Sequence, residues 1–381
     1  MERRRRICFV SGTRADFGKI KALLARIEAA GRYDYGIFAT GMHMLARYGS
    51  TVDEIRKAGF RNIYPFINQD SAISSQMDLT LANTIQGFGH YVREFPPDLI
   101  VVHGDRVETL AGAMVGVLNN ILVAHIEGGE VSGTVDELIR HAVTKLSHLH
   151  FVANDEAARR LAQMGERPES VFVIGSPDID IMLSDALPTL DDVRRRYAIP
   201  FEGYGILLYH PVTTEVAELR AHVLEVVEGV LAGGLPFVVF YPNNDAGSEV
   251  ILDAYERLRG DPRFRLLPSM RFEYFLSLLR SAEAIVGNSS AGVREAPVYG
   301  VPALNVGTRQ ANRARHALIR NVPEDRAAIA AALDDLPTSH PSTDFGRGDS
   351  ARLFLEILDR DATWTTPRQK QFRDVLEEVH A

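Results

Sequence analysis

Cysteine, long apolar runs and an excess of basic residues are all missing from this chain, and each absence excludes a class of protein. Cys8 is the one cysteine in 381 residues, so an internal disulfide is excluded and a reducing, cytoplasmic compartment is expected. The basic run Arg3–Arg6 is not followed by an apolar stretch of signal-peptide or membrane-span length, so no membrane partner is expected. The net charge of −8 argues against a general nucleic-acid surface, so an anionic substrate would need local positive partners.

Three familiar site signatures are missing as well. The glycines of the first turn, Gly12 and Gly18, do not have the G-x-G-x-x-G spacing of a dinucleotide site. The segment around Ser289 nearly spells the G-x-S-x-G of serine hydrolases, but Ala291 stands where the last glycine belongs. Three histidines invite a metal site but lack a compact ligand spacing, so neither a metal nor a cofactor is expected. They are His141, His148 and His150.

The length of 381 residues exceeds what one hydrophobic core usually supports, which predicts two domains. Short apolar segments alternate with helical patterns, which predicts parallel sheets covered by helices. The predicted strands are Arg6–Val10, Tyr35–Ala39, Leu99–Val102, Ile121–Ile126, Leu149–Val152, Val171–Ile174, Gly205–Tyr209, Phe237–Tyr241, Phe264–Leu267, Glu283–Val286 and Ala303–Val306.

The fold class expected is therefore α/β, with two Rossmann-like doubly wound domains facing a central cleft. The first should span residues 1–178, because Ser176–Pro200 has the composition of a domain crossover. The second, a nucleotide-binding domain, should span residues 200–362. Helical patterns at Gly348–Leu358 and Pro367–Val379 close the chain, and the terminal helix within residues 363–381 is expected to return to the first domain.

Two carboxylates follow neighbouring predicted strands of the first domain. Asp105 comes after Leu99–Val102 in the sequence His-Gly-Asp-Arg, and Glu127 follows Ile121–Ile126 in His-Ile-Glu-Gly-Gly-Glu. Ligands of open α/β sheets collect beyond the carboxyl ends of the strands. Asp105 and Glu127 are therefore expected to converge on one site.

Asp136 and Glu137 open the next helical pattern and cannot both face one ligand, since neighbouring helical residues point about 100° apart. Thr134 and Glu137 fit a capping box, which gives Glu137 a structural role and leaves Asp136 as the catalytic candidate. A first-turn acid paired with Arg140 is the other interpretation of Asp136.

The turn after the first strand contains Arg14, a candidate phosphate clamp or a solvated loop arginine. His43 follows the second strand, where it either donates to a ligand or closes a loop. The segment Gln69–Asn83 shows no clear period and is expected to be mobile.

A second polar cluster, Gly287–Ala296, is a small-residue turn that opens a helix predicted to run to Tyr299. Backbone amides at this helix start, together with the hydroxyls of Ser289 and Ser290, would cradle a diphosphate without net positive charge. Glu295, about one turn into the helix, either accepts from ribose hydroxyls or forms a salt bridge along the helix.

Arg309 and Arg313 follow the next predicted strand, in Gly-Thr-Arg-Gln-Ala-Asn-Arg. Arginines at the carboxyl end of a strand can neutralise a diphosphate, although either residue taken singly could equally be a surface group.

Together these motifs resemble the hydrolysing UDP-N-acetylglucosamine 2-epimerases of sialic acid biosynthesis, in particular the bacterial enzymes that serve capsules and surface glycans. The matching motifs span nearly the whole chain in order. They are Ser-Gly-Thr-Arg-Ala-Asp-Phe, Gly-Met-His-Met, His-Gly-Asp-Arg, His-Ile-Glu-Gly-Gly-Glu-Val-Ser-Gly-Thr-Val-Asp, Gly-Ser-Pro-Asp, His-Pro-Val-Thr-Thr-Glu, Pro-Asn-Asn-Asp-Ala-Gly, Gly-Asn-Ser-Ser-Ala-Gly-Val-Arg-Glu-Ala-Pro and Gly-Thr-Arg-Gln.

The resemblance implies a glycosyltransferase-B-like fold, UDP-N-acetylglucosamine and UDP as partners, and a homodimer or homotetramer. It implies elimination of UDP to 2-acetamidoglucal, followed by hydration to N-acetylmannosamine with inversion at carbon-2. By motif, the catalytic residues would be Asp105, Glu127, Asp136 and His210. The substrate contacts would be Arg14, His43, Arg106, Asn243, Ser289, Ser290, Glu295, Arg309 and Arg313.

Two branches of the family remain as alternatives. Relatives that act on a UDP-2,4-diacetamido-trideoxyhexose of the legionaminic acid pathway have Gly-Asp-Arg-Gln where this chain has Gly-Thr-Arg-Gln, so Thr308 and Val293–Glu295 favour the N-acetylglucosamine branch. Non-hydrolysing epimerases have a His-x-Glu-Ala-Gly-Leu-Arg type of motif, so His-Ile-Glu-Gly-Gly-Glu favours release of the free sugar. A glycosyltransferase would need an acceptor site, and a nucleotide-sugar sensor would have no use for three convergent acids.

Overall fold

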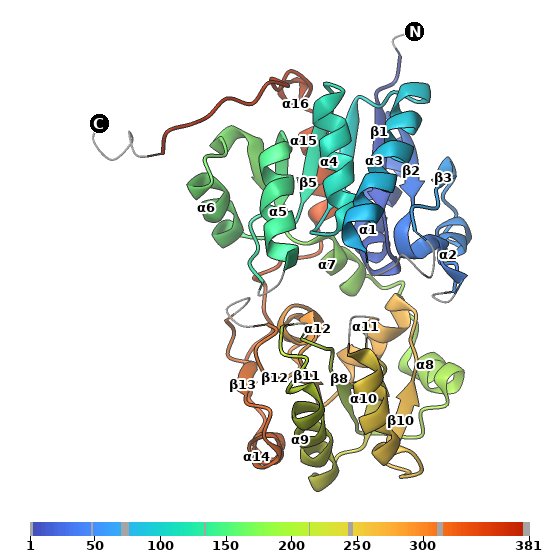
Figure 1. Ribbon diagram of the computed structural model, residues 1–381, viewed down its shortest axis with the longest axis vertical. Helices are drawn as coiled ribbons and strands as arrows, with labels where there is room; N and C mark the ends of the chain where they lie inside the picture. The colour runs from blue at the N-terminus through green and yellow to red at the C-terminus, as the bar shows by residue number, and fades with distance from the viewer. Residues whose placement is uncertain are drawn as a thin grey trace. The chain divides into compact units, whose positions relative to one another are not determined.

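The computed structural model describes residues 3–46, 49–69, 76–132, 135–212, 214–242, 247–310 and 315–375. The chain forms two compact units. Unit 1 consists of Met1–Glu130, Thr134–Leu183 and Gly346–Ala381, and unit 2 consists of Val131–Gly133 and Ser184–Phe345. Each unit is an α/β domain built on one sheet (Figure 1).

Unit 1 has a sheet in the order β3-β2-β1-β4-β5-β6-β7, and all of its paired strands are parallel. The strands are β1 (Arg6–Ser11), β2 (Asp34–Ala39), β3 (Ile63–Pro65), β4 (Leu99–His103), β5 (Leu122–Ile126), β6 (Leu149–Val152) and β7 (Val171–Val173). The helices are α1 (Arg14–Ala30), α2 (Val52–Lys57), α3 (Met77–Glu94), α4 (Val107–Leu118), α5 (Val135–Leu146), α6 (Asp155–Gln163), α7 (Pro177–Met182), α15 (Ser350–Leu358) and α16 (Asp361–Trp364).

Alternate residues of β1, β2, β4 and β5 enter two separate cores, because successive side chains point to opposite faces of a sheet. In β1, Phe9 packs with α1 and α15, whereas Val10 packs on the other face with α3, α4 and α5. Helices therefore cover both faces of the sheet, and its strands are apolar on both sides. The strand order changes direction between β1 and β4, which is the position where such folds bind ligands.

Unit 2 repeats this plan with the order β10-β9-β8-β11-β12-β13, again with parallel pairs. Its strands are β8 (Gly205–Leu208), β9 (Phe237–Phe240), β10 (Phe264–Leu267), β11 (Ala284–Gly287), β12 (Ala303–Val306) and β13 (Ile319–Val322). Its helices are α8 (Leu190–Tyr197), α9 (Leu219–Ala232), α10 (Ser248–Tyr255), α11 (Phe272–Arg280), α12 (Ser290–Val293), α13 (Glu295–Val298) and α14 (Arg326–Asp334). The switch in strand order lies between β8 and β11.

The predicted α/β fold of two Rossmann-like domains is confirmed by these two sheets. The return to unit 1, however, begins at Gly346 rather than at residue 363. The reason is the apolar face of α15: Phe354 and Leu358 are buried in the core that contains α1 and β1.

Two predictions of local structure are wrong. Met77–Glu94 forms α3, so residues 77–83 of the segment expected to be mobile are helical, while residues 70–75 lie outside the described part. The predicted helix at Pro367–Val379 is not present over residues 367–375, and the rest of it is not described. Instead, Lys370 donates to the carbonyl oxygen of Ser147 at 2.6 Å and to a carboxylate oxygen of Glu166 at 2.6 Å, which ties this non-helical segment to unit 1.

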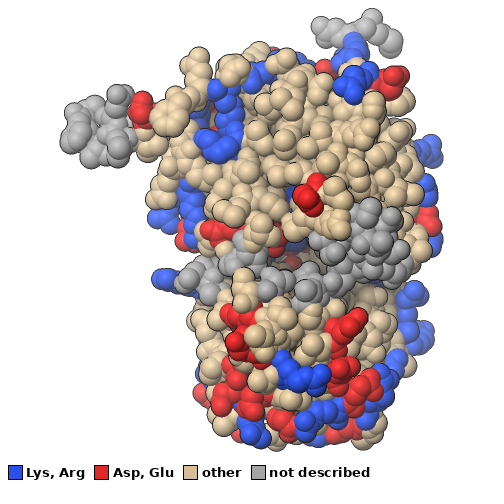
Figure 2. All heavy atoms as spheres, viewed as in Figure 1, with Lys and Arg blue, Asp and Glu red and all other residues tan. Residues whose placement is uncertain are grey.

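No helix in the described part of the chain is both long and apolar enough to cross a bilayer. Figure 2 shows basic and acidic side chains interspersed over unit 2, and largely uncharged residues over α3, α4 and α5 of unit 1. Among the described residues of the face in view, no continuous basic stripe is present, in line with the net charge of −8.

Candidate functional site

The carboxyl edge of the unit 1 sheet holds Asp105 and Glu127, as the sequence predicts. β4 and β5 run side by side in the register His103↔Ile126, so the residues that follow them emerge at the same edge. Glu127 has a φ of 63°, in the left-handed region that a residue with a side chain adopts only at a cost of about 1–3 kcal/mol. Its backbone N–H donates to the carbonyl of Phe151 at 2.9 Å, which holds this conformation in place.

The Glu127 carboxylate is 6% exposed and lies among polar partners. Oε2 is 3.4 Å from Lys19 Nζ and 3.1 Å from His103 Nε2, and Oε1 accepts a hydrogen bond from the Ser176 hydroxyl. Lys19 Nζ is also 3.3 Å from the carboxylate of Asp178, which is 1% exposed. Lys19, whose side chain is 16% exposed, is therefore shared by two buried carboxylates, and its positive charge offsets part of the cost of burying them. The residues Lys19, His103 and Ser176 were not predicted.

Asp105 forms an ion pair with the guanidinium of Arg140. The Arg140 side chain is 2% exposed and also donates from Nη1 to the carbonyl of Glu130 at 3.0 Å, so its position is fixed. The Asp105 carboxylate is 27% exposed, which leaves it within reach of a substrate. Arg140, the partner that the second interpretation assigns to Asp136, therefore contacts Asp105 in the structure.

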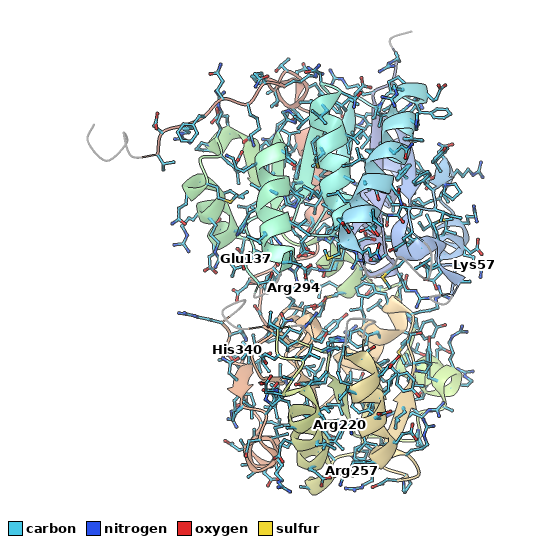
Figure 3. All side chains as sticks on the ribbon, in the orientation of Figure 1. Lys57, Glu137, Arg220, Arg257, Arg294 and His340 are labelled. Carbon is cyan, nitrogen blue, oxygen red and sulfur yellow. The ribbon has the colours of Figure 1, made fainter. Side chains whose placement is uncertain are left out.

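Asp136 lies half-buried in the first turn of α5. Its neighbour Glu137, labelled at the start of α5 in Figure 3, is 3.4 Å from His141 Nε2. Desolvation lowers the pKa of Arg106, but the charges of several carboxylates outweigh it and raise that pKa above its ordinary value. These carboxylates are Glu108, Asp16, Asp105 and Asp136. Asp105, Arg106 and Asp136 therefore share one electrostatic environment. The capping residue Thr134 lies outside the described residues.

His125, within β5, holds the turn that contains Asp105 by contacting the backbone of Gly104. Its ring is fully buried, with Nε2 2.8 Å from the carbonyl oxygen of Gly104 and Nδ1 3.2 Å from the Thr144 hydroxyl. Burial lowers the pKa of His125 to about 3, so the ring is neutral at pH 7 and donates from Nε2 to Gly104.

The turn after β1 is organised by Asp16 rather than by Arg14. Asp16 accepts hydrogen bonds from the amides of Gly12 and Thr13, at 2.8 and 3.1 Å, and forms a capping box with Thr13 at the start of α1. Arg14 is paired with Glu54 on α2 at 2.8 Å. The sequence Thr-Arg-Ala-Asp carries the signal for this cap, with Thr13 as the cap and Asp16 three residues later.

His43 adopts the loop-closing arrangement. Its side chain is 0% exposed, with Nε2 2.9 Å from the Ser11 hydroxyl and Nδ1 2.7 Å from the Thr51 hydroxyl. Burial, its largest influence, lowers the pKa of His43. In this arrangement the ring has no face toward a ligand, and we do not retain His43 among the substrate contacts.

In unit 2, His210 and Asn288 follow β8 and β11, the two strands at the switch point. His210 is half-buried, and burial together with the nearby charge of Arg309 lowers its pKa to about 3. The Asn288 side chain is fully buried and makes two hydrogen bonds with the backbone of His210. Its Oδ1 accepts from the His210 N–H at 2.7 Å, and its Nδ2 donates to the His210 carbonyl at 2.8 Å. Asn288 lies in the motif Gly-Asn-Ser-Ser-Ala-Gly, from which no role for it could be predicted.

Ser289 and Ser290 come next at this edge. Ser289 caps α12, where its hydroxyl accepts from the amide of Ala291 at 3.3 Å. The predicted helix does not run unbroken to Tyr299: it is divided into α12 and α13, and Arg294, labelled in Figure 3, lies between them. Pro297 has no N–H to continue the hydrogen-bond ladder, which explains the break. Glu295 is 6% exposed in the first turn of α13.

Arg309 follows β12 and donates from Nη1 to the carbonyl of Asn288 at 3.2 Å. Gln310 donates to the same oxygen at 3.1 Å, and the Thr308 hydroxyl donates to Glu215 at 2.6 Å. Asn243 and Arg313 lie outside the described residues.

One group with metal-ligating atoms occurs in the described residues, and the sequence did not predict it. Ligand atoms of Glu215, His222 and Glu324 lie within 4.8 Å of one another. Two of these residues already have hydroxyl partners, since Thr308 donates to Glu215 and Tyr209 donates to Glu324 at 2.7 Å. These contacts account for the cluster without an ion.

Known proteins match the chain over nearly its full length. A family model described as UDP-N-acetylglucosamine 2-epimerase matches residues 25–359. The chain is 44% identical over 377 residues to the UDP-N-acetylglucosamine 2-epimerase of Neisseria meningitidis serogroup B, covering 97% of this chain and 99% of that protein. It is 34% identical to the UDP-N,N'-diacetylbacillosamine 2-epimerase (hydrolyzing) of Legionella pneumophila, covering 93% and 95%.

A solved structure shows the same fold. The crystal structure of a UDP-GlcNAc 2-epimerase from Neisseria meningitidis bound to UDP-GlcNAc superimposes with a TM-score of 0.76 at 18% identity, covering 93% of this chain and 99% of that one.

Proposed function

Because the chain belongs to the UDP-N-acetylglucosamine 2-epimerase family, we propose that it is the hydrolysing type, which converts UDP-N-acetylglucosamine to N-acetylmannosamine and UDP. The product would serve as the precursor in the first step of sialic acid synthesis for a capsule or surface glycan. We further propose that the protein acts in the cytoplasm as a homodimer or homotetramer, without a metal or cofactor.

The reaction needs a base and a good leaving group at the same time. The proton on carbon-2 of the sugar has no adjacent carbonyl and is weakly acidic, so departure of UDP must run ahead of its removal. Electrostatic stabilisation of the diphosphate and a positioned carboxylate are then the two largest requirements. Unit 1 offers the carboxylates, and unit 2 offers the donors for a diphosphate.

The observation that carries the proposal is the set of carboxylate side chains at the carboxyl edge of the unit 1 sheet. Glu127 is 6% exposed and is held in a left-handed backbone conformation by its hydrogen bond to Phe151, and Asp105 is held by Arg140 while 27% exposed. Fixed, differently solvated carboxylates suit different roles. We propose that one of Asp105, Glu127 and Asp136 removes the carbon-2 proton and that another places or deprotonates the water that adds to the glucal.

In unit 2, His210 would donate a hydrogen bond to the diphosphate. Its pKa of about 3 means that it is neutral at pH 7, so the positive charge at this edge would come from Arg309. The hydroxyls of Ser289 and Ser290 would add donors, and Glu295 would accept from the ribose. Arg14, Arg106, Asn243 and Arg313 complete the proposed contacts.

A UDP-2,4-diacetamido sugar is the competing candidate for the substrate, because the Legionella relative is named as a diacetylbacillosamine epimerase. We favour N-acetylglucosamine because this chain has Thr308 where that branch is expected to have aspartate. The Thr308 hydroxyl donates to Glu215 at 2.6 Å, whereas an aspartate at this position could not donate and would place a second carboxylate beside Glu215. Free-sugar release is supported by His-Ile-Glu-Gly-Gly-Glu, which differs from the non-hydrolysing motif.

Amide variants of the three carboxylates test the proposal. Asp105→Asn, Glu127→Gln and Asp136→Asn are each expected to lower kcat for UDP release by about 10²–10⁴-fold, while calorimetry shows UDP still binding.

Asp180→Asn is the matched control, because Asp180 accepts from the amides of Ser350 and Ala351 at 2.9 and 2.8 Å and caps α15. This variant should melt at a lower temperature yet retain kcat. Full turnover in all three carboxylate variants would contradict the proposed function.

A further inference from the structure

We propose that Asn288 is the residue that positions His210, and that it does so from the neighbouring strand; this inference rests on the proposed function. The Asn288 amide group pairs with both backbone polar groups of His210, accepting at 2.7 Å and donating at 2.8 Å. Such pairing fixes the His210 peptide as a second strand would, just past the end of β8.

The sequence places Asn288 there through the glycine before it. Gly287 ends β11 opposite Leu208 of β8 and has a φ of 132°. A Cβ at Gly287 would lie 2.2 Å from the carbonyl oxygen of Leu208, so only glycine allows the two strand ends to approach this closely. This approach brings the amide of the next residue within reach of the His210 backbone.

The backbone carbonyl of Asn288 has a second role. It accepts from Arg309 Nη1 at 3.2 Å and from Gln310 Nε2 at 3.1 Å. Arg309 is also the charge that helps to lower the pKa of His210. Asn288 therefore connects the segments after β8, β11 and β12, and places the imidazole and the guanidinium in a fixed relation.

No other side chain can substitute for this amide at its position. Asn288 is 0% exposed, so water does not replace a lost partner. Aspartate has the same shape and would accept from the His210 N–H, but it cannot donate to the His210 carbonyl. Alanine leaves both groups unpaired.

A double-mutant cycle tests whether Asn288 acts through His210. Asn288→Ala in the full-length protein is expected to lower kcat/KM for UDP release by about 30-fold, the effect of two lost hydrogen bonds. In the His210→Ala background, the same change should lower it by less than about 3-fold, because the group it positions is gone. Asn288→Asp, which keeps the shape, should lose at least about 10-fold and serves if the alanine variant does not fold.

Asn305→Ala is the matched control. Asn305 is also a buried asparagine of unit 2, 3% exposed, but its Nδ2 donates to Asn321 at 2.7 Å. Asn305→Ala should change kcat/KM by the same factor in the wild-type and His210→Ala backgrounds. If the Asn288 variants lowered kcat/KM by the same factor in the wild-type and His210→Ala backgrounds, the inference would be overturned.

A spectroscopic readout separates this inference from the proposed function. The imidazole ¹⁵N resonances of His210, assigned with the His210→Ala variant, should shift or broaden in Asn288→Asp and stay unchanged in Asn305→Ala. If the wild-type protein released no UDP, the proposed function would fail, whereas these resonances would still decide the role of Asn288. Unmoved His210 resonances in both Asn288 variants would overturn it.

Discussion

Replacing Glu127 by glutamine removes one charge from the site without changing the shape of the side chain. The native carboxylate is 6% exposed and accepts from Ser176 through Oε1 while Oε2 faces Lys19 and His103. An amide has one oxygen, so one of these partners loses its acceptor and meets an N–H₂ group instead.

The cost to stability follows from this loss. A buried donor left without an acceptor costs about 1–3 kcal/mol, so the free energy of unfolding should fall by roughly 2 kcal/mol and Tm by about 4–8 °C. If Glu127 acts as a general base or places the water, kcat should fall by about 10²–10⁴-fold, far more than the change in stability would produce below Tm. Steady-state UDP release at 25 °C and differential scanning fluorimetry measure the two effects separately.

Asp178→Asn is the control that separates a catalytic role of Glu127 from the effect of removing an anion beside Lys19. Asp178 is 1% exposed and 3.3 Å from Lys19 Nζ, so its amide variant also removes a buried anion from that cation. It should lower Tm by a similar amount and leave kcat within about 3-fold of wild type. A Glu127→Gln variant with full activity, or an Asp178→Asn variant with an equal loss of kcat, would contradict a catalytic role for Glu127.

Three further predictions concern pH and stability. His125 and His210 both have a folded-state pKa of about 3, so below about pH 6.5 the unfolded chain takes up protons that the folded chain does not. Stability is therefore complete above pH 6.5 and falls as the pH drops toward 3; urea unfolding at pH 5 should show a loss of roughly 2 kcal/mol per histidine, and a flat profile would contradict this. Gly287→Ala should lower Tm sharply or prevent folding, whereas Gly234→Ala, whose Cβ would have nothing within 4 Å, should change Tm little, and equal melting curves would be the contrary result. Lys370→Ala removes three donated hydrogen bonds, so limited proteolysis should cut the C-terminal segment faster than in wild type, and an unchanged rate would show that these bonds do not hold it.

The strands of both sheets were predictable where they are buried on both faces. Leu99–Val102 and Phe237–Phe240 are continuous apolar runs, which leave little choice of structure. The edge strands β3 and β13 were missed because Ile63–Pro65 and Ile319–Val322 are short and partly exposed, so their sequences carry no clear period. The C-terminal segment was misassigned because its conformation depends on Lys370 reaching Glu166, 204 residues away.

The residues of the candidate site also divide into those that the sequence could locate and those that it could not. Asp105 and Glu127 could be located because each follows a strong strand signal, and the sheet brings strand ends together. Their partners could not be located, because Lys19 is 108 residues from Glu127 and Ser176 is 49 residues from it. Asn288 pairs with a backbone 78 residues away, and backbone partners leave no trace in side-chain patterns. Only tertiary structure reveals such contacts.

Proton NMR of the purified protein with UDP-N-acetylglucosamine in deuterated water tests the central claim most directly. We expect UDP together with free N-acetylmannosamine that carries deuterium at carbon-2, since the proton is removed and replaced from solvent. Intact UDP-N-acetylmannosamine would contradict the hydrolysing mechanism and assign the protein to the non-hydrolysing branch. An unchanged spectrum, followed by turnover of a UDP-2,4-diacetamido sugar, would contradict the proposed substrate.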